Sequence, residues 1–434
     1  MTSVLRSSVP AAGRGSRPTA GPAWVLPPST RALHCDALVL NAGLRQSLVT
    51  VRSLGRRGLS VAAAGTHPSA PAFASRWCQQ GFVFPPEEGV EAYLAALEEW
   101  LERARARVLV TSHDGTIALL RPRRALLGDR VRLALAGEEA LSIAVNKERT
   151  LAVARRLGLR GPREVVVHGV DDVPRALAEI GLPAVVKPVE SWLWRGTDGE
   201  RVGSQLAVTP REAHLAVEAL TQFGGATLFQ QLLTGRREAV SFLYANGEMH
   251  ARFAQWARRT NPPLGGESVV RESIAVPPDI GGQAELLVRE IDLQGYSEVE
   301  FRRDSAGVPY LMEINPRLSA SVEVAVRAGV DFPYLVYQWA CEEPIARTAP
   351  YRVGCWMRHL GGDIETTMAA LEQRGRPGVP SPARAIWDFG VSFLKPMPYD
   401  YLDWHDPLPA VRATTAFTRS TIRRFLSRMK RTSA

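Results

Sequence analysis

Two glutamates and one asparagine lie on two short segments that alternate polar and apolar residues. Ser297–Phe301 and Tyr310–Asn315 are separated by turn residues, which predicts a β-hairpin. Side chains two apart share a strand face, so Glu313 and Asn315 point the same way, and Glu300 can reach that side from the neighbouring strand. Such oxygen ligands suit Mg²⁺, which keeps positions for phosphate oxygens. An exposed acidic hairpin with solvated glutamates is the open alternative.

Nearby cations strengthen the first interpretation. Arg317 follows two residues after the hairpin and could clamp a phosphate or carboxylate with two hydrogen bonds. Only four of the 53 basic residues are lysines; Lys147 lies near a predicted helix start, and Lys187 ends a predicted strand. Two ammonium groups reaching phosphates from separate elements would complement a carboxylate-bound metal. Chance survival of a few lysine codons is the alternative.

The elements that must position these residues begin near Cys35. Ala37–Leu40, Leu59–Gly65 and Arg107–Thr111 are short apolar runs typical of buried strands, and the spacing of apolar residues predicts a helix at about 90–105. Strands alternating with helices predict a parallel α/β domain over 35–140.

His113-Asp114-Gly115 follows the third of these strands, where a crevice would lie. A helix-capping aspartate and a turn glycine explain this tripeptide as well as substrate contact does, so we do not predict it as part of the site.

A different pattern starts at about residue 141. We expect one helix over Leu141–Leu157, a loop over Val189–Gly203, and a mixed C-terminal region over 346–434 that ends in a helix. Strands are predicted at Glu164–Val167, Ala184–Pro188, Thr227–Gln230, Ala239–Tyr244 and His250–Trp256, with a further helix near 211–223. The predicted fold class is α/β followed by α+β.

The charge of +9 over 434 residues belongs to the chain ends. Residues 1–34 carry four arginines and residues 411–434 carry seven basic residues, both without an acid, which leaves 42 bases against 44 acids between them. This distribution weakens a nucleic-acid-binding interpretation. No stretch approaches the roughly 18 apolar residues of a membrane span. Four scattered cysteines favour a reducing cytoplasm.

The two ends themselves leave alternatives open. Residues 1–34 lack periodicity and read as a disordered basic tail, although an organelle transit peptide has a similar composition. The terminal basic helix is expected to pack on the protein body; lying on an anionic membrane surface is the alternative.

Six sequence blocks, taken together, resemble the ATP-grasp superfamily, in the order in which that family carries them. The blocks are Asn146-Lys147, Leu182–Pro188, Phe229–Gln231, Gly235–Glu238, Val299–Phe301 and Glu313–Arg317. The last block, continued by Leu318–Ser321, looks much like the ATP-binding halves of carbamoyl-phosphate synthase large subunits, although the chain is too short for that duplicated architecture.

The resemblance implies a Rossmann-like pre-ATP-grasp domain at 35–140, an ATP-grasp domain at 141–345 with subdomains at about 141–228 and 229–345, and a C-terminal region. It implies Lys147 and Lys187 on the ATP phosphates, and Arg317 at the γ-phosphate and acyl phosphate. Metal ligands would be Glu300, Glu313 and Asn315, with Mg²⁺ as the ion and Mn²⁺ as a substitute. Nucleotide contacts would come from the hinge residues Gln230, Gln231, Leu232 and Leu233, and from Glu238 on ribose.

The implied reaction is ligation of a small-molecule carboxylate to an amine through an acyl phosphate, catalysed by Arg317 and Lys187. We expect the substrate near Gly265, Gly266 and Arg271, in and after the loop Asn261–Ser268. Arg271 could bind a substrate carboxylate, and a surface arginine is the open alternative. Nucleic acid and a transmembrane segment are not expected, and a homodimer is kept open. An ATP-binding protein without ligase turnover is the first alternative, and a basic nucleic-acid binder is the second.

Overall fold

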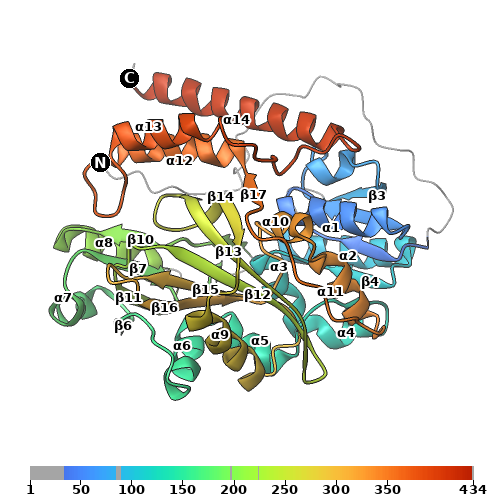
Figure 1. Ribbon diagram of the computed structural model, residues 1–434, viewed down its shortest axis with the longest axis horizontal. Helices are drawn as coiled ribbons and strands as arrows, with labels where there is room; N and C mark the ends of the chain where they lie inside the picture. Colours follow the sequence, from blue (N-terminus) through green and yellow to red (C-terminus); the bar gives the residue numbers. More distant parts are fainter. Residues whose placement is uncertain (1–33, 85–88, 196–197, 223, 433–434) are drawn as a thin grey trace.

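The computed structural model describes residues 34–84, 89–195, 198–222 and 224–432. Its N-terminal unit is a five-stranded parallel sheet of order β3-β2-β1-β4-β5 (Figure 1). The central strands are wholly apolar and buried, as expected for a sheet covered on both faces. The strands are β1 Ala37–Val39, β2 Val61–Gly65, β3 Cys78–Val83, β4 Val108–Val110 and β5 Arg132–Leu133.

Helices and short 3-10 turns connect these strands. The helices are α1 Arg45–Arg56, α2 Gly89–Ala104, α3 Asp114–Leu120 and α4 Arg124–Gly128, and the 3-10 turns are η1 Pro71–Ala74 and η2 Arg121–Arg123. The α/β architecture predicted for this part of the chain is confirmed. The predicted tail at 1–34 lies, apart from its last residue, outside the described residues.

Two helices, α5 Glu138–Ala144 and α6 Lys147–Arg156, occupy the stretch for which we predicted one continuous helix. That prediction was wrong because Asn146 ends the helical run and starts another. Its backbone is extended, and its side-chain oxygen accepts a hydrogen bond from the backbone N–H of Arg149. This N-cap places Lys147 in the first turn of α6.

A four-stranded antiparallel sheet of order β10-β7-β11-β6 follows. Its strands are β6 Glu164–Val167, β7 Ala184–Pro188, β10 Gln205–Ala207 and β11 Thr227–Gln231, and it is accompanied by η3 Val170–Asp172, α7 Val173–Ile180 and α8 Pro210–Thr221. The stretch expected as a loop contains an antiparallel hairpin, β8 Trp192–Arg195 with β9 Asp198–Arg201, which corrects that prediction. The scattered glycines of this stretch concealed the strand pattern.

The largest sheet is antiparallel, with the order β16-β15-β12-β13-β14-β17. Its strands are β12 Arg237–Ala245, β13 Glu248–Asn261, β14 Glu267–Ile274, β15 Gly295–Arg303, β16 Pro309–Asn315 and β17 Trp356–Arg358, and helices α9 Pro278–Glu290, α10 Glu323–Ala328 and α11 Phe332–Ala340 flank it. Helices α9 and α6 share an apolar core with one face of this sheet, which leaves polar residues of β15 and β16 on the other face.

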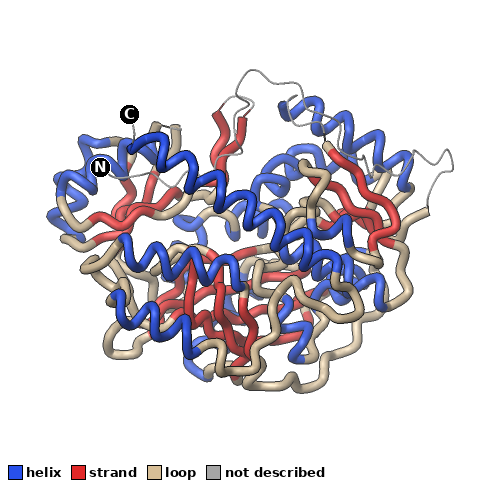
Figure 2. Tube along the Cα trace, turned by 90° about the horizontal axis from the view of Figure 1, so that it is seen from above, coloured by secondary structure: helices blue, strands red, loops and turns tan. Residues whose placement is uncertain are grey.

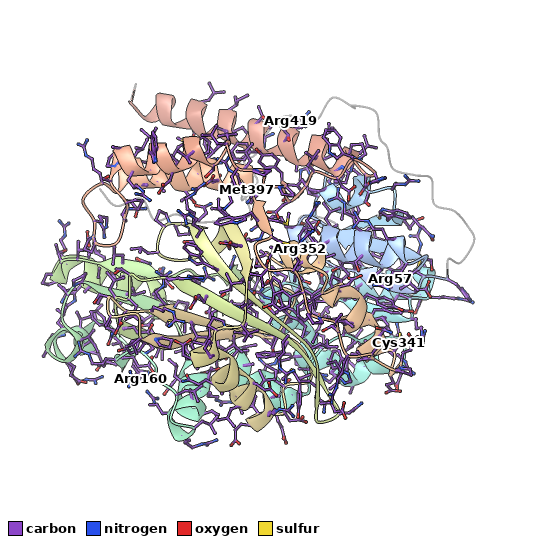
Figure 3. All side chains as sticks on the ribbon, viewed as in Figure 1. Arg57, Arg160, Cys341, Arg352, Met397 and Arg419 are labelled. Carbon is purple, nitrogen blue, oxygen red and sulfur yellow. The ribbon has the colours of Figure 1, made fainter. Side chains whose placement is uncertain are left out.

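The C-terminal region consists of α12 Leu360–Glu372, α13 Pro382–Val391 and the long α14 Leu408–Thr432. In Figure 1 these helices form one edge of the molecule, and in Figure 2 α14 runs diagonally to the marked C-terminus. Arg419, labelled in Figure 3, marks α14 on that outer edge. The ring of Phe417 lies against Gly361, and Arg424 pairs with Glu365, so α14 rests on α12.

Buried ion pairs join the C-terminal region to the other two parts. Asp400 accepts hydrogen bonds from Arg45 of α1 and Arg271 of β14, and Arg52 pairs with Asp406. All four cysteines are free thiols. No helix within the described ranges combines the length and the apolar character needed to cross a bilayer.

Candidate active site

The predicted hairpin forms and brings its three oxygen-bearing side chains to one sheet face. In the register of β15 with β16, Glu300 lies opposite Glu313, and Glu298 lies opposite Asn315. The amide of Asn315 donates a hydrogen bond to Glu300 at 3.0 Å. Arg237 of β12 donates three hydrogen bonds to the Glu300 carboxylate, at 2.9, 2.6 and 2.5 Å. The glutamates are therefore held in place rather than solvated.

Both predicted lysines converge on the same carboxylates. Lys147 Nζ lies 3.5 Å from Glu313 and donates a hydrogen bond to Ser191 at 2.9 Å. Burial, together with the neighbouring Lys147 ammonium, lowers the pKa of Lys187 to about 8. Burial alone would raise the pKa of Glu313, but Lys147, Lys187 and Arg237 outweigh it and hold that pKa below its ordinary value. Two elements, α6 and β7, thus aim cations at one acidic sheet face.

Arg317 reaches the same face but is paired with Asp114 of α3, a residue that we did not predict to be part of the site. The guanidinium donates two hydrogen bonds to the carboxylate, one of them at 2.8 Å, and a third to Asn315 at 3.3 Å. Burial opposes ionisation of Asp114, yet Arg317 holds the pKa of Asp114 well below its usual range. No sequence signal links these residues, because 203 positions separate them.

Glu298 is a second site-face residue that the sequence analysis did not single out. It is buried and accepts hydrogen bonds from Gln255 at 2.6 Å and Ser241 at 3.5 Å. Burial and the neighbouring Glu300 raise the pKa of Glu298 to about 7. Alternation along β15 was the available signal, since Glu298 and Glu300 are two residues apart and share a face.

The predicted hinge residues connect the two sheets. Gln230 and Gln231 end β11, and Leu232 and Leu233 lead toward β12. Gln230 donates a hydrogen bond to Glu164 at 2.9 Å, and Gln231 accepts one from the backbone N–H of Arg163 at 3.0 Å.

The predicted ribose ligand, Glu238, follows at the start of β12. It is buried and paired with Arg236 at 2.8 Å and Arg303 at 2.7 Å. Its carboxylate is therefore already held by two guanidiniums at this end of the sheet.

The predicted substrate residues do not all share one environment. Arg271 is fully buried, and both of its terminal nitrogens donate hydrogen bonds to the carboxylate of Asp400. In the structure this side chain therefore joins β14 to the C-terminal region. Gly265 and Gly266 lie in the turn between β13 and β14. Gly266 has φ of +67° and its carbonyl accepts a hydrogen bond from Arg237 at 2.5 Å, which ties this turn to the residue that holds Glu300.

The β8–β9 hairpin covers the site from the side of α3. The Trp192 indole lies so close to two glycines that a Cβ on Gly115 would stand 2.6 Å from it, and one on Gly199 2.4 Å. The His113 ring meets the same indole edge-on, with centroids 5.1 Å apart. Burial lowers the pKa of His113 to about 4.

A hollow remains between α3, α5 and the end of β16. It is lined by Asp114, Ile117, Ala118, Arg121, Ala144, Val145, Lys147, Glu190, Ser191, Trp192, Glu313, Ile314, Asn315 and Pro316. Three of the candidate phosphate and metal residues, Lys147, Glu313 and Asn315, therefore open into a partly apolar space that residues of the N-terminal unit help to enclose.

The donor set of the site fits a magnesium ion that is shared with phosphates. No group of three or more His, Cys, Asp or Glu side chains suited to a metal occurs in the described part of the chain. Glu300, Glu313 and the Asn315 oxygen are hard oxygen donors, and Mg²⁺ is commonly held by one or two carboxylates together with substrate phosphates.

Comparison with known proteins agrees with this geometry. The family described as "ATP-grasp in the biosynthetic pathway with Ter operon" matches residues 227–360. A D-alanine–D-alanine ligase of Chromohalobacter salexigens is 28% identical over 251 residues, which cover 53% of this chain and 75% of that protein.

Two solved structures share the fold. The biotin carboxylase domain of Hydrogenobacter thermophilus 2-oxoglutarate carboxylase, in complex with MgADP, ADP and bicarbonate, has a TM-score of 0.60 and 16% identity, covering 74% of this chain and 73% of that one. An ADP complex of N5-carboxyaminoimidazole ribonucleotide synthetase has a TM-score of 0.59 and 15% identity, covering 84% and 99%. The family match over residues 227–360, the sequence relatives and the fold all support the resemblance of this chain to ATP-grasp proteins of the carboxylate–amine ligase type.

Proposed function

We propose that the chain is an ATP-dependent ligase that activates a small-molecule carboxylate as an acyl phosphate and joins it to an amine, releasing ADP and phosphate. The observation that carries this proposal is the convergence of Lys147, Lys187 and Arg317 on the sheet face that holds Glu300 and Glu313. No single one of these residues would indicate phosphoryl transfer, but three cations around two carboxylates suit a nucleotide with its metal.

The chemistry needs positioning and charge stabilisation more than a protein nucleophile. A carboxylate oxygen of the acid attacks the γ-phosphorus of ATP, and the bond to the bridging oxygen of ADP breaks. The amine nitrogen then attacks the acyl carbon, loses a proton, and expels phosphate. We assign Lys147 and Lys187 to the ATP phosphates and Arg317 to the transferred phosphoryl group and the acyl oxygens.

We propose that Mg²⁺ is held by Glu300, Glu313 and Asn315, with Mn²⁺ as a substitute. When bound, the ion supplies positive charge to the phosphate oxygens. Arg237 and Lys147 currently neutralise the two carboxylates, and their cationic groups would remain beside the phosphates. We assign the adenine to the segment Gln230–Leu233 and the ribose to Glu238.

We also propose that the protein works in the cytoplasm. Its four free thiols are consistent with that reducing compartment.

The proposal is tested by incubating the full chain with MgATP and a metabolite extract, measuring ADP release and identifying products by mass spectrometry. Glu313→Gln is expected to abolish turnover, and Glu91→Gln, at a glutamate 84% exposed, to leave it unchanged. Tight MgATP binding without ADP release across a broad panel of acids and amines would instead favour an ATP-binding protein without turnover.

A further inference from the structure

Large apolar side chains that remain exposed gather in the C-terminal helices, which form one edge of the molecule (Figure 1). Single exposed apolar residues are normal on a protein surface, but a concentration of them in one layer indicates an interaction surface. They include Trp387 on α13 and Leu394 in the turn after it, and Leu408, Val411, Ile422 and Leu426 on α14.

Helix α14 has two faces in different surroundings. The ring of Phe417 lies against Gly361 of α12, so the face that carries Phe417 is packed on the protein. Val411, Ile422 and Leu426 are 60%, 52% and 51% exposed. Their sequence spacing is close to whole helical turns, so these three side chains form one strip, which points away from the side of Phe417. We call Val411, Ile422 and Leu426 the outer strip.

The same helix supplies positive charge without a compensating acid. Residues 411–434 carry seven basic residues and no acid. Arg419 and Arg423 are exposed, and helical periodicity places them one above the other beside the outer strip; Figure 3 labels Arg419 on the outer edge. Among the described side chains, one ion pair involves α14, between Arg424 and Glu365 of α12. The outer face of α14 is therefore apolar along one strip and cationic beside it.

We propose that the outer face of α14 binds the surface of an anionic lipid bilayer, with the helix lying parallel to that surface. The outer strip enters the boundary between headgroups and acyl chains, and Arg419 and Arg423 reach the lipid phosphates beside it. The helix lies on the bilayer and does not cross it. This inference does not depend on the proposed ligase function.

An anionic bilayer is the partner that satisfies both kinds of side chain. It offers an apolar layer directly beneath a layer of negative charge. A nucleic acid would match the arginines through its phosphates but would leave the aliphatic strip without an apolar partner. A second copy docked through the same face would bring two basic, acid-free helices together, and their like charges would repel each other.

The test measures how the full-length protein partitions onto vesicles by co-sedimentation. Vesicles of phosphatidylcholine alone are compared with vesicles in which part of that lipid is replaced by phosphatidylglycerol. We expect partition onto the anionic vesicles, which salt weakens by screening, and little onto the neutral ones. Arg419→Gln with Arg423→Gln should weaken the partition about 25-fold, at about fivefold per arginine near an anionic surface. Ile422→Ser with Leu426→Ser should weaken it about tenfold or more, because less apolar area enters the bilayer.

Matched controls change the same residue types outside the C-terminal helices. Leu215→Ser with Leu286→Ser alters two leucines of α8 and α9 that are 45% and 46% exposed. Arg156→Gln with Arg160→Gln removes two exposed arginines, and Figure 3 labels Arg160 at the edge opposite Arg419. Both controls should partition like the wild type. Melting temperatures of all four variants verify that each one folds.

The proposal is overturned if anionic vesicles do not sediment the protein, if neutral vesicles sediment it equally well, or if either α14 variant partitions like the wild type. A dimer in the absence of lipid that Ile422→Ser with Leu426→Ser dissociates would instead make this face a contact between copies. Binding to a DNA duplex without binding to vesicles would make it a nucleic-acid surface, and either result excludes the bilayer.

Discussion

Asp400 is the point at which the three parts of the chain are joined, and Asp400→Asn tests that role. The carboxylate is buried and accepts hydrogen bonds from Arg45 of α1 at 2.7 Å and from Arg271 of β14. Both guanidiniums are buried too. Removing the negative charge leaves the buried Arg271 without its counter-charge and leaves Arg45 with Glu267 as its remaining carboxylate partner. Breaking such a buried pair costs about 3–5 kcal/mol.

The expected effect on melting follows from the size of the chain. At about 2.1 cal/mol/K per residue, the 434 residues give an unfolding entropy of about 0.9 kcal/mol/K. A loss of about 3–5 kcal/mol therefore lowers the midpoint of the unfolding transition by about 3–6 °C. Differential scanning calorimetry near neutral pH measures this shift.

The matched control is Asp279→Asn. Asp279 also pairs with an arginine, Arg303, but its side chain is 44% exposed, so losing this ion pair should lower the free energy of unfolding by less than about 1 kcal/mol.

The stabilisation from Asp400 should also depend on pH. Arg271 and Arg45 hold the pKa of Asp400 below its usual range, so its stabilisation is complete above about pH 4 and is lost at lower pH. A midpoint for Asp400→Asn within about 1 °C of the control would refute this reasoning.

Three further predictions concern the site and its supports. Burial and the neighbouring Lys147 lower the pKa of Lys187 to about 8, so the affinity of the wild type for ATP, measured by calorimetry, should fall as pH rises above about 8. Lys187→Met should bind ATP more weakly and lose this pH dependence. An affinity of the wild type that does not change with pH would contradict the prediction. Gly266→Ala should destabilise the chain by about 1–3 kcal/mol, since φ is +67° and the new Cβ would lie 2.1 Å from the carbonyl oxygen of Asn261. Gly265→Ala is the control, since its Cβ meets nothing within 4 Å, and equal melting of the two variants would exclude this strain. Asn146→Ala removes the N-cap of α6 and should lower the free energy of unfolding by about 1 kcal/mol. A lower melting temperature would show this loss, and an unchanged melting temperature would argue against the cap.

Local patterns predicted much of the fold because apolar runs and alternation are properties of short segments. Ala184–Pro188 forms β7 over its full predicted length, and the hairpin that carries Glu300 and Glu313 forms as its alternation indicates. The break at Asn146 was missed because the apolar periodicity continues across it. The β8–β9 hairpin was missed because glycines and arginines obscure its strands.

Partners distant in sequence could not be predicted. Asp114 contacts Arg317 across 203 positions, and Arg271 contacts Asp400 across 129. A sequence without aligned relatives contains no signal that pairs these residues. The sequence alone therefore predicts Arg271 at the substrate and does not predict Asp114 as part of the site. Tertiary packing decides both outcomes: a buried guanidinium must find a carboxylate, wherever the chain places one.

We propose that Glu300, Glu313, Lys147 and Lys187 form one nucleotide–metal site. Its most direct test is a crystal structure with Mn²⁺ and a nonhydrolysable ATP analogue, in which anomalous scattering locates the ion. We predict a peak within coordination distance, about 2.0–2.3 Å, of Glu300 and Glu313 oxygens, with both lysine ammoniums on the phosphates. A nucleotide bound elsewhere, or an ion that contacts neither carboxylate, would contradict the claim.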